Sequence, residues 1–556
     1  MIKKWFKSGD PWIWLNAAAV SASLIIVIGL LILIAYQGLS HFWPKAVVQA
    51  QYIQADATNA NPASIRIIGE IHNDEEVSIE QLKGLGINLD TDKETATRLL
   101  LKTGNRDVSG ADFKWLLQPY LTKSEYPKEI IVLERREWGN FYGYIKSISH
   151  NGNIIRKPAE AWQELSIRLQ HSEDIYQQIR NIEKGDIGSI NYSMEKLRLA
   201  KRRLELNKED TAENLAELDA KRKKLDKEYS LLEADLAKLY KEFNHGSITA
   251  ETMGGQIITI PFAKIVRAYQ PNALNLFEKI TLYFQKMWEF VADDPREANT
   301  EGGIFPAIFG TVMMVLLMSV LVTPFGVIAA VYLREYAKQG AVTRIIRIAV
   351  NNLAGVPSIV YGVFGLGFFI YFLGGNIDQL FYAEALPSPT FGTPGILWSS
   401  LTLAILTVPV VIVATEEGLS RIPRSIREGS LALGATKAET LWRTILPMAT
   451  PSMMTGMILA IARAAGEVAP LMLVGVVKLA PSLPLDINAP FFHLERKFMH
   501  LGFHIYDVGF QSPNVEAARP LVYATAFLLI AVIVLLNLSA IYIRNRLREQ
   551  YRGLES

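Results

Sequence analysis

The chain has 556 residues, a formal net charge of +2 and no cysteine. Residues 46–300 are charged like a soluble domain, whereas residues 302–544 consist mostly of long apolar runs. So balanced a charge gives no reason to expect nucleic-acid binding, which shows as a strongly basic patch or domain. The absence of cysteine excludes disulfide bonds and cysteine-ligated metal sites.

The N-terminal segment predicts a membrane helix. Lys3, Lys4 and Lys7 precede a charge-free stretch whose core, Ile13–Tyr36, is long enough to cross a bilayer. A cleaved signal peptide is the alternative, but the apolar region is longer than a typical signal sequence and no A-x-A-like cleavage site ends it. Because basic residues flank the inner side of membrane helices, residues 1–45 are expected to form a cytoplasmic tip and an uncleaved first span.

Residues 46–300 predict one extramembrane domain of the α+β class. Segments 64–73 and 130–149 are rich in β-branched and aromatic residues, as strands are, and the second contains a turn at Gly139-Asn140. The other elements expected here are a returning strand at 256–270 and an amphipathic helix near the membrane at 275–291.

Between residues 158 and 243 the pattern becomes helical. Leucine recurs every seven residues from Leu218 to Leu239, a period typical of coiled coils. Asp210 and Glu213 have the spacing of a capping box, which predicts a turn near residues 207–211. We therefore expect an antiparallel coiled-coil hairpin that protrudes from the β part and whose charged surface is structural.

Five further apolar stretches bring the expected number of membrane spans to six. They are Gly302–Leu333, Ile348–Ile377, Leu397–Ala414, a stretch from near Pro447 to Val477, and Leu521–Ile543. If the N-terminus is inside, the flanks after the second, fourth and sixth spans must be basic. These flanks contain Arg334, Lys338, Arg344 and Arg347, then Arg421, Arg424, Arg427, Lys437 and Arg443, then Arg544, Arg546, Arg548 and Arg552. We therefore expect both termini in the cytoplasm and residues 46–300 on the opposite side, the periplasm.

The inner loop 416–447 contains the most specific motif of the chain. The spacing of its apolar residues predicts two short helices broken at Gly434, which would form a docking surface for another protein. No Walker A sequence occurs anywhere in the chain, so an ATP-driven function would require a separate ATPase.

The segment REGSLALGATKAETLWRTILP in this loop resembles the cytoplasmic coupling loop of ABC importer permeases. That pattern is Glu-Ala-Ala, three residues, Gly, nine residues, Ile-x-Leu-Pro. This sequence departs from it with Gly429 and Ser430 in place of the alanines and Thr444 at the Ile position. The resemblance implies that ATPase coupling involves Glu428, Gly429, Ser430, Gly434, Ala435, Leu446 and Pro447.

Neighbouring segments narrow the resemblance to the Pst phosphate importers. NTEGGIFPAIFGT (299–311), NLAGVPSIVYGVFGLGFF (352–369) and AIARAAGEVAPL (460–471) are similar to PstA-type permease subunits, whereas residues 46–300 resemble only the extended versions of that family. The resemblance implies an α-helical membrane protein with the type I ABC importer permease fold in residues 301–556. It also implies a location in the inner membrane, among its lipids, and no enzyme activity in this chain. The implied partners are a second permease subunit of the PstC type, ATPase subunits of the PstB type and a phosphate-binding protein of the PstS type.

Arg463 and Glu467 lie about halfway along the fifth expected span. A charged side chain there costs roughly 2.5–3.5 kcal/mol on insertion scales. Four residues apart on a helix, the two share a face and can pair, so one interpretation is a neutralised pair that ties two spans together. The other is that Arg463 offers an oxyanion a transient site while Glu467 limits its affinity. Gly466 and Pro470 are expected to bend this helix.

His493, His500 and His504 are spaced to share one helical face in an outer loop. An interfacial amphipathic helix is favoured over a three-histidine metal site, so neither a metal nor a cofactor is expected.

The favoured function is that of a permease subunit which moves inorganic phosphate inward. A permease for sulfate or molybdate is the near alternative, because a fold does not fix a substrate. A membrane-anchored scaffold or sensor, with the hairpin as its working part, belongs to another class, and a passive channel is a third. Neither of these last two needs a coupling loop.

Overall fold

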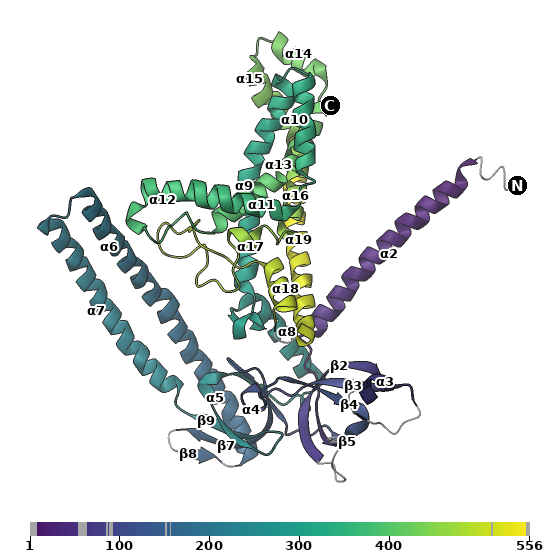
Figure 1. The fold of residues 1–556 in the computed structure, drawn as a ribbon, viewed down its shortest axis with the longest axis vertical. Coiled ribbons are helices and arrows are strands. Elements are labelled where there is room, and N and C mark those ends of the chain that lie inside the picture. Colours follow the sequence, from purple (N-terminus) through teal and green to yellow (C-terminus); the bar gives the residue numbers. More distant parts are fainter. Residues whose placement is uncertain are drawn as a thin grey trace. The chain divides into compact units, whose positions relative to one another are not determined.

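The structure, a computed structural model, describes residues 8–53, 64–84, 87, 93–150, 153–155, 157–512 and 515–551. It divides into two compact units (Figure 1): unit 1 comprises Met1–His41 with Ile304–Ser556, and unit 2 comprises Phe42–Gly303. Lys3, Lys4, Lys7 and Arg552, which contribute to the charge argument for orientation, lie outside the described residues.

Six helices within the described residues are long and apolar enough to cross a membrane, so the expected number of spans is confirmed. These candidate spans are Asp10–Ser40, Phe305–Tyr336, Ser358–Phe381, Ile396–Arg421, Lys437–Gly466 and Ala518–Glu549. The α-helices of unit 1 are α2 (Asp10–Ser40), α9 (Phe305–Val331), α10 (Ala341–Leu353), α11 (Ser358–Phe364), α12 (Gly375–Phe381), α13 (Ile396–Arg421), α14 (Arg424–Ala432), α15 (Lys437–Thr440), α16 (Leu446–Gly466), α17 (Leu471–Val474), α18 (Leu501–Phe510) and α19 (Val515–Tyr551). Its π-helical and 3₁₀ segments are η5 (Tyr332–Tyr336), η6 (Gly365–Gly374), η7 (Ala383–Ala385) and η8 (Leu441–Ile445).

Helix α13 is the central helix of unit 1. Of its most apolar stretch, 67% is buried, against 0% for α2 and 6% for α19, whose apolar surfaces are left to lipid. Small side chains allow close approach: Gly326 of α9 lies against Val411 of α13, and Gly456 of α16 lies against Ala414. Membrane helices associate through such small residues, because lipid is as apolar as the side chains that it contacts.

Two of the expected spans are interrupted. The expected helix 348–377 is divided into α10 and α11, and the expected helix 447–477 consists of α16 followed by the short α17. The second helix of each pair begins directly after a proline, Pro357 or Pro470. Proline lacks an N–H group and disfavours helical backbone in the residue before it. The prediction of continuous helices was therefore wrong, and the bend expected near Gly466 and Pro470 is a complete break.

Unit 2 contains two main antiparallel sheets, with strand orders β4-β3-β2-β1-β5 and β10-β9-β7-β6-β11, and β8 pairs with β7. The strands are β1 (Val47–Ile53), β2 (Ser64–Ser78), β3 (Thr95–Lys102), β4 (Phe113–Leu117), β5 (Leu121–Glu125), β6 (Ile131–Arg135), β7 (Phe141–His150), β8 (Asn153–Ile155), β9 (Ser247–Glu251), β10 (Ile257–Pro261), β11 (Ile265–Tyr269), β12 (Pro295–Arg296) and β13 (Glu301–Gly302). The three segments predicted as strands are confirmed, and the turn at Gly139-Asn140 joins β6 to β7 with a φ of 68° at Gly139.

The helices of unit 2 include a long hairpin (Figure 1). One arm contains α5 (Pro158–Arg180), the π-helical η2 (Asn181–Ile187) and α6 (Gly188–Asn207), and the other is α7 (Ala212–Phe243). The turn predicted between them is confirmed, but its cap is Thr211 rather than Asp210, because the Thr211 hydroxyl accepts the N–H of Asn214 at 3.3 Å. The heptad leucines are half-buried, and the supercoiling of a coiled coil stays a prediction. The remaining helices are α3 (Ile79–Gly84), α4 (Arg106–Ser109), α8 (Leu276–Ala292), η1 (Gln118–Tyr120), η3 (Phe262–Lys264) and η4 (Glu297–Asn299).

Candidate functional site

Arg463 lies in the last turn of α16, and Glu467 lies just beyond the end of that helix. Glu467 has φ −80° and ψ 133°, an extended conformation, so the two residues do not share a continuous helix as predicted. The Arg463 Nε and Glu467 Oε1 atoms are 3.8 Å apart, an ion pair without a hydrogen bond. The pair therefore forms at a helix terminus, where the backbone can move, rather than in the middle of a rigid helix.

The guanidinium of Arg463 is stabilised mainly by helix ends. Its Nη2 donates to the carbonyl oxygen of Ala354, which follows α10, at 3.5 Å. The C-terminal ends of α10 and α16 both carry partial negative charge, which favours a cation at this place. The Arg463 Nε is buried and has no hydrogen-bond partner, while the whole side chain is 35% exposed. One part of the guanidinium thus keeps unused donor capacity.

The two interrupted helices meet beside this arginine. A Cβ atom at Gly362 of α11 would lie 2.7 Å from the Cα of Pro470, so only glycine permits this approach. The breaks that follow α10 and α16 therefore lie at one level of unit 1. In transport proteins, broken helices of this kind place backbone dipoles beside the substrate path.

The coupling loop, defined here as residues 424–447, has the predicted form of two short helices separated by Gly434. Gly434 has a φ of 86°, which side chains other than glycine rarely adopt. Thr436 and Glu439 form a capping box that starts α15, and the Ser430 hydroxyl lies 2.9 Å from that of Thr440, joining α14 to α15. The loop is therefore a folded element with a fixed shape.

Polar contacts fix the coupling loop to the ends of two earlier spans, at η5 and at α13. Arg427 Nη2 pairs with Glu335 Oε1 at 2.9 Å and also donates to the carbonyl of Leu419 at 2.8 Å. Lys437 donates to the carbonyl of Glu335 at 2.5 Å and lies over the ring of Tyr336. These contacts could not be predicted, because no local sequence pattern links η5 to a loop some ninety residues later.

The loop presents apolar groups to solvent. Leu433 is 91% exposed and Trp442 is 75% exposed, whereas Leu441 between them is buried. Of the residues predicted for ATPase coupling, Glu428, Gly429 and Gly434 are exposed, while Ser430, Ala435, Leu446 and Pro447 are half-buried. The loop therefore offers an apolar tip on a rigid base, which suits the docking of another protein.

A cavity of about 260 Å³ is lined by residues of η5, α10 and α13. Arg347 of α10 crosses it to pair with Glu416 of α13 at 2.5 Å. This ion pair joins the first of the two interrupted helices to the helix that precedes the loop. It provides a physical connection between the loop and the break beside Arg463.

The three outer-loop histidines do not form the predicted helical face. His493 lies in a loop, His500 caps the N-terminus of α18, and His504 is inside that helix. All three are buried, so α18 is a packed helix and not an interfacial one, and that interpretation was wrong. Among the described residues, no group of three histidine or carboxylate side chains is arranged to hold a metal ion.

Comparison with known proteins places this geometry in a family. Residues 322–549, which include the coupling loop and Arg463, match the family described as "Binding-protein-dependent transport system inner membrane component". The phosphate transport system permease protein PstA 1 of Mycobacterium tuberculosis (strain CDC 1551 / Oshkosh) is 36% identical over 244 residues, which are 44% of this chain and 71% of that protein. The PstA protein of Yersinia pestis is 31% identical over 216 residues, 39% of this chain and 63% of that protein.

More distant similarities agree with this assignment or add nothing to it. The probable ABC transporter permease YqgI of Bacillus subtilis (strain 168) is 29% identical over 261 residues, 46% of this chain and 82% of that protein. A solved structure of the MetNI methionine ABC transporter covers 47% of this chain and 98% of its own, at 16% identity and a TM-score of 0.32, too low to support an argument. Because the match to PstA 1 reaches 36% identity over 71% of that protein, this chain belongs to the PstA family of binding-protein-dependent transport permeases.

Proposed function

We propose that this chain is the PstA-type permease subunit of an ABC importer that moves inorganic phosphate across the inner membrane. The observation that carries the proposal is the coupling loop: a rigid helical turn with an exposed apolar tip, in a chain of the PstA family. ATP is hydrolysed by separate subunits, and this chain transmits their movement to the path.

The proposed partners follow from the family. They are a second permease subunit of the PstC type, ATPase subunits of the PstB type that dock on the coupling loop, and a phosphate-binding protein of the PstS type. Both termini lie in the cytoplasm and residues 46–300 in the periplasm, an orientation supported by the basic flanks of the spans.

Arg463 is proposed to contact the anion during its passage. The guanidinium of an arginine can donate to two oxygens of a tetrahedral oxyanion, and the 35% exposure of the Arg463 side chain supports such a contact. Glu467, 3.8 Å away, keeps the site weak enough to release the ion. Sulfate and molybdate share this chemistry, so competition by these anions during phosphate uptake distinguishes the alternatives.

A scaffold or sensor built on the hairpin is the second class of function, and deletion of residues 158–243 would abolish it. The anchored loop disfavours this function, because a membrane anchor needs no rigid docking element. In a scaffold, changes in the coupling loop would have no effect.

The test of the docking role is co-purification of the ATPase subunit with a Leu433→Asp variant. Leu433 is 91% exposed, so the change leaves the fold intact while it places a charge on the proposed contact. Leu231→Asp on α7, at a leucine that is 61% exposed, is the matched control. We expect ATPase retention to fall in the first variant only; equal retention in both would refute docking on this loop.

A further inference from the structure

Helix α8 of unit 2 exposes an unusually apolar face. Leu276, Ile280, Phe284 and Trp288 follow one another at four-residue intervals, and Phe277 is next to the first of them. These five side chains are 39–77% exposed. Residues four apart lie on the same side of a helix, so they form one continuous stripe. A stripe of large apolar groups on a folded domain marks a surface that something else covers.

The side of α8 opposite the stripe is tied to the rest of unit 2 by ion pairs whose side chains are 12–20% exposed. Lys286 pairs with Glu134 of β6 at 2.6 Å, and Glu289 pairs with both Arg267 of β11 and Arg296 at 2.8 Å. Burial alone would raise the pKa of Glu134, but Lys286 and Arg267 lower that pKa to about 2, so the carboxylate stays charged. Rotating α8 to hide its apolar stripe would break these ion pairs and leave their charges uncompensated, so the pairs hold the stripe outward.

Both peptide connections between unit 2 and its neighbouring helices adjoin α8. Phe42, two residues after the end of α2, packs on α8 with ring centroids 5.1 Å from Phe290 and 6.5 Å from Tyr283. At the other end of the unit, a Cβ on Gly303 would collide with the carbonyl oxygens of Asp293 and Glu289, where α8 ends. The apolar helix α9 begins two residues later. Residues that contact α8 therefore lie two residues from the ends of two candidate membrane spans, α2 and α9.

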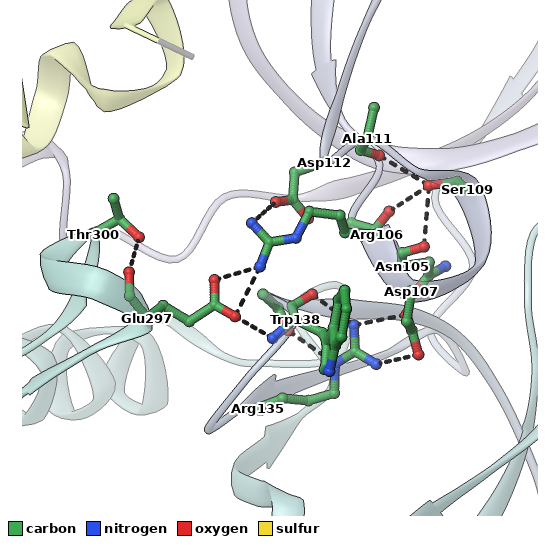
Figure 2. Close-up of polar contacts among 12 residues, drawn as sticks. Asn105, Arg106, Asp107, Ser109, Ala111, Asp112, Arg135, Trp138, Glu297 and Thr300 are labelled. Atoms are coloured by element: carbon green, nitrogen blue, oxygen red, sulfur yellow. Dashed lines mark hydrogen bonds and ion pairs between the residues drawn. The ribbon is translucent and has the colours of Figure 1, made fainter. Parts of the chain in front are cut away.

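The segment between α8 and α9 is fixed to the sheets rather than loose. Figure 2 shows Glu297 held by the guanidinium of Arg106, with Nη2 at 2.7 Å and 2.9 Å from its two carboxylate oxygens. Glu297 also accepts the backbone N–H of Trp138, and Arg106 pairs with Asp112 at 3.5 Å. The neighbouring Arg135 pairs with Asp107 by two bonds of 2.9 and 3.0 Å. These contacts fix the segment that follows α8 to the sheets of unit 2.

We propose that α8 lies in the plane of the membrane surface, with its apolar stripe inserted among the lipids, as an anchor for unit 2. A helix of this kind buries its apolar face about 5–10 Å into the boundary between headgroups and acyl chains, where tryptophan is also favoured. Lipid is the occupant because two residues that pack against α8, Phe42 and Gly303, each lie two residues from a candidate membrane span. The inference depends on the chain being a membrane protein and is independent of the substrate proposed above.

The absence of cysteine makes a direct test possible in the full-length chain. Single cysteines at Phe284→Cys and Trp288→Cys are spin-labelled in the assembled protein, in vesicles of phosphatidylethanolamine and phosphatidylglycerol. Leu231→Cys on the exposed side of α7 is the matched control, because Leu231 is also an exposed apolar residue of unit 2. The measured quantities are the accessibility of each label to oxygen, which concentrates in lipid, and to a polar nickel chelate, which stays in water.

We expect the ratio of oxygen to chelate accessibility to be several-fold higher at positions 284 and 288 than at 231. High chelate accessibility at 284 and 288 would mean that the stripe faces water and would refute the proposal. Low accessibility to both reagents would mean that protein, a partner subunit or another part of the chain, covers the stripe, and would refute it equally. All three positions are exposed, so the substitutions leave the fold of unit 2 unchanged.

Discussion

The coupling loop and the break beside Arg463 are held in place in opposite ways. The loop is tied to η5 by an ion pair of 2.9 Å and by Lys437, and its own two helices are joined at 2.9 Å. Arg463 makes longer contacts, at 3.5 Å with the carbonyl of Ala354 and at 3.8 Å with Glu467. The difference supports the proposed roles, because a rigid element suits the transmission of movement and a weakly held charge suits an ion that must enter and leave.

The largest effect is expected from Arg463→Ala. Loss of the Arg463 guanidinium should reduce phosphate uptake into vesicles by about tenfold or more, equivalent to about 1.4 kcal/mol of lost anion stabilisation. Arg463→Lys should retain part of the uptake, because lysine keeps the positive charge. The rest should be lost, because lysine cannot make the bidentate contact. If Arg463→Ala took up phosphate at the wild-type rate, Arg463 would not contact the anion and its role would be structural.

A smaller effect is expected from Arg427→Met, which makes the loop less rigid. Glu335, whose side chain is only 13% exposed, would lose its ion-pair partner, at a cost of about 1–3 kcal/mol. Phosphate transported per ATP hydrolysed should fall, while the ATPase still binds. Arg424→Met, at an exposed position on the same helix, is the control and should keep the wild-type ratio. The same loss in both variants would contradict the anchoring role of Arg427.

The smallest effect is expected from the backbone at Gly434. With a φ of 86°, Gly434 has a left-handed backbone conformation. Residues other than glycine adopt this conformation at a free-energy cost of about 1–2 kcal/mol. Gly434→Val should increase hydrogen exchange in residues 424–445, and Gly434→Asn should do so less, because asparagine adopts this conformation more readily. If both variants exchange alike and as slowly as the wild type, the loop does not depend on this turn.

Much of the architecture could be predicted because it depends on local patterns. Span length, basic flanks, the period of the leucines and the glycine in the coupling loop all act over a few residues, and the structure has six spans and the two loop helices as expected. The family resemblance also came from continuous motifs. These features need no knowledge of distant neighbours.

The features that could not be predicted depend on long-range packing. The pairing of Arg427 with Glu335 joins residues far apart in sequence. Glu467 was expected on the helix of Arg463, but the proline three residues later ends that helix first. The histidines were expected on an exposed helix, yet His500 and His504 are buried where α18 packs on neighbouring helices. Apolar periodicity does not distinguish a helix that faces protein from one that faces lipid.

The central claim is that the ATPase subunit docks on the coupling loop and that Arg463 contacts the anion during its passage. The most direct measurement is phosphate uptake divided by the amount of bound ATPase subunit, in vesicles containing either Leu433→Asp or Arg463→Ala. The account predicts that Leu433→Asp lowers the bound ATPase but leaves uptake per bound ATPase unchanged. It predicts that Arg463→Ala leaves binding unchanged and lowers uptake per bound ATPase about tenfold. The opposite pattern, with normal uptake per ATPase in Arg463→Ala and a loss in Leu433→Asp, would contradict the account.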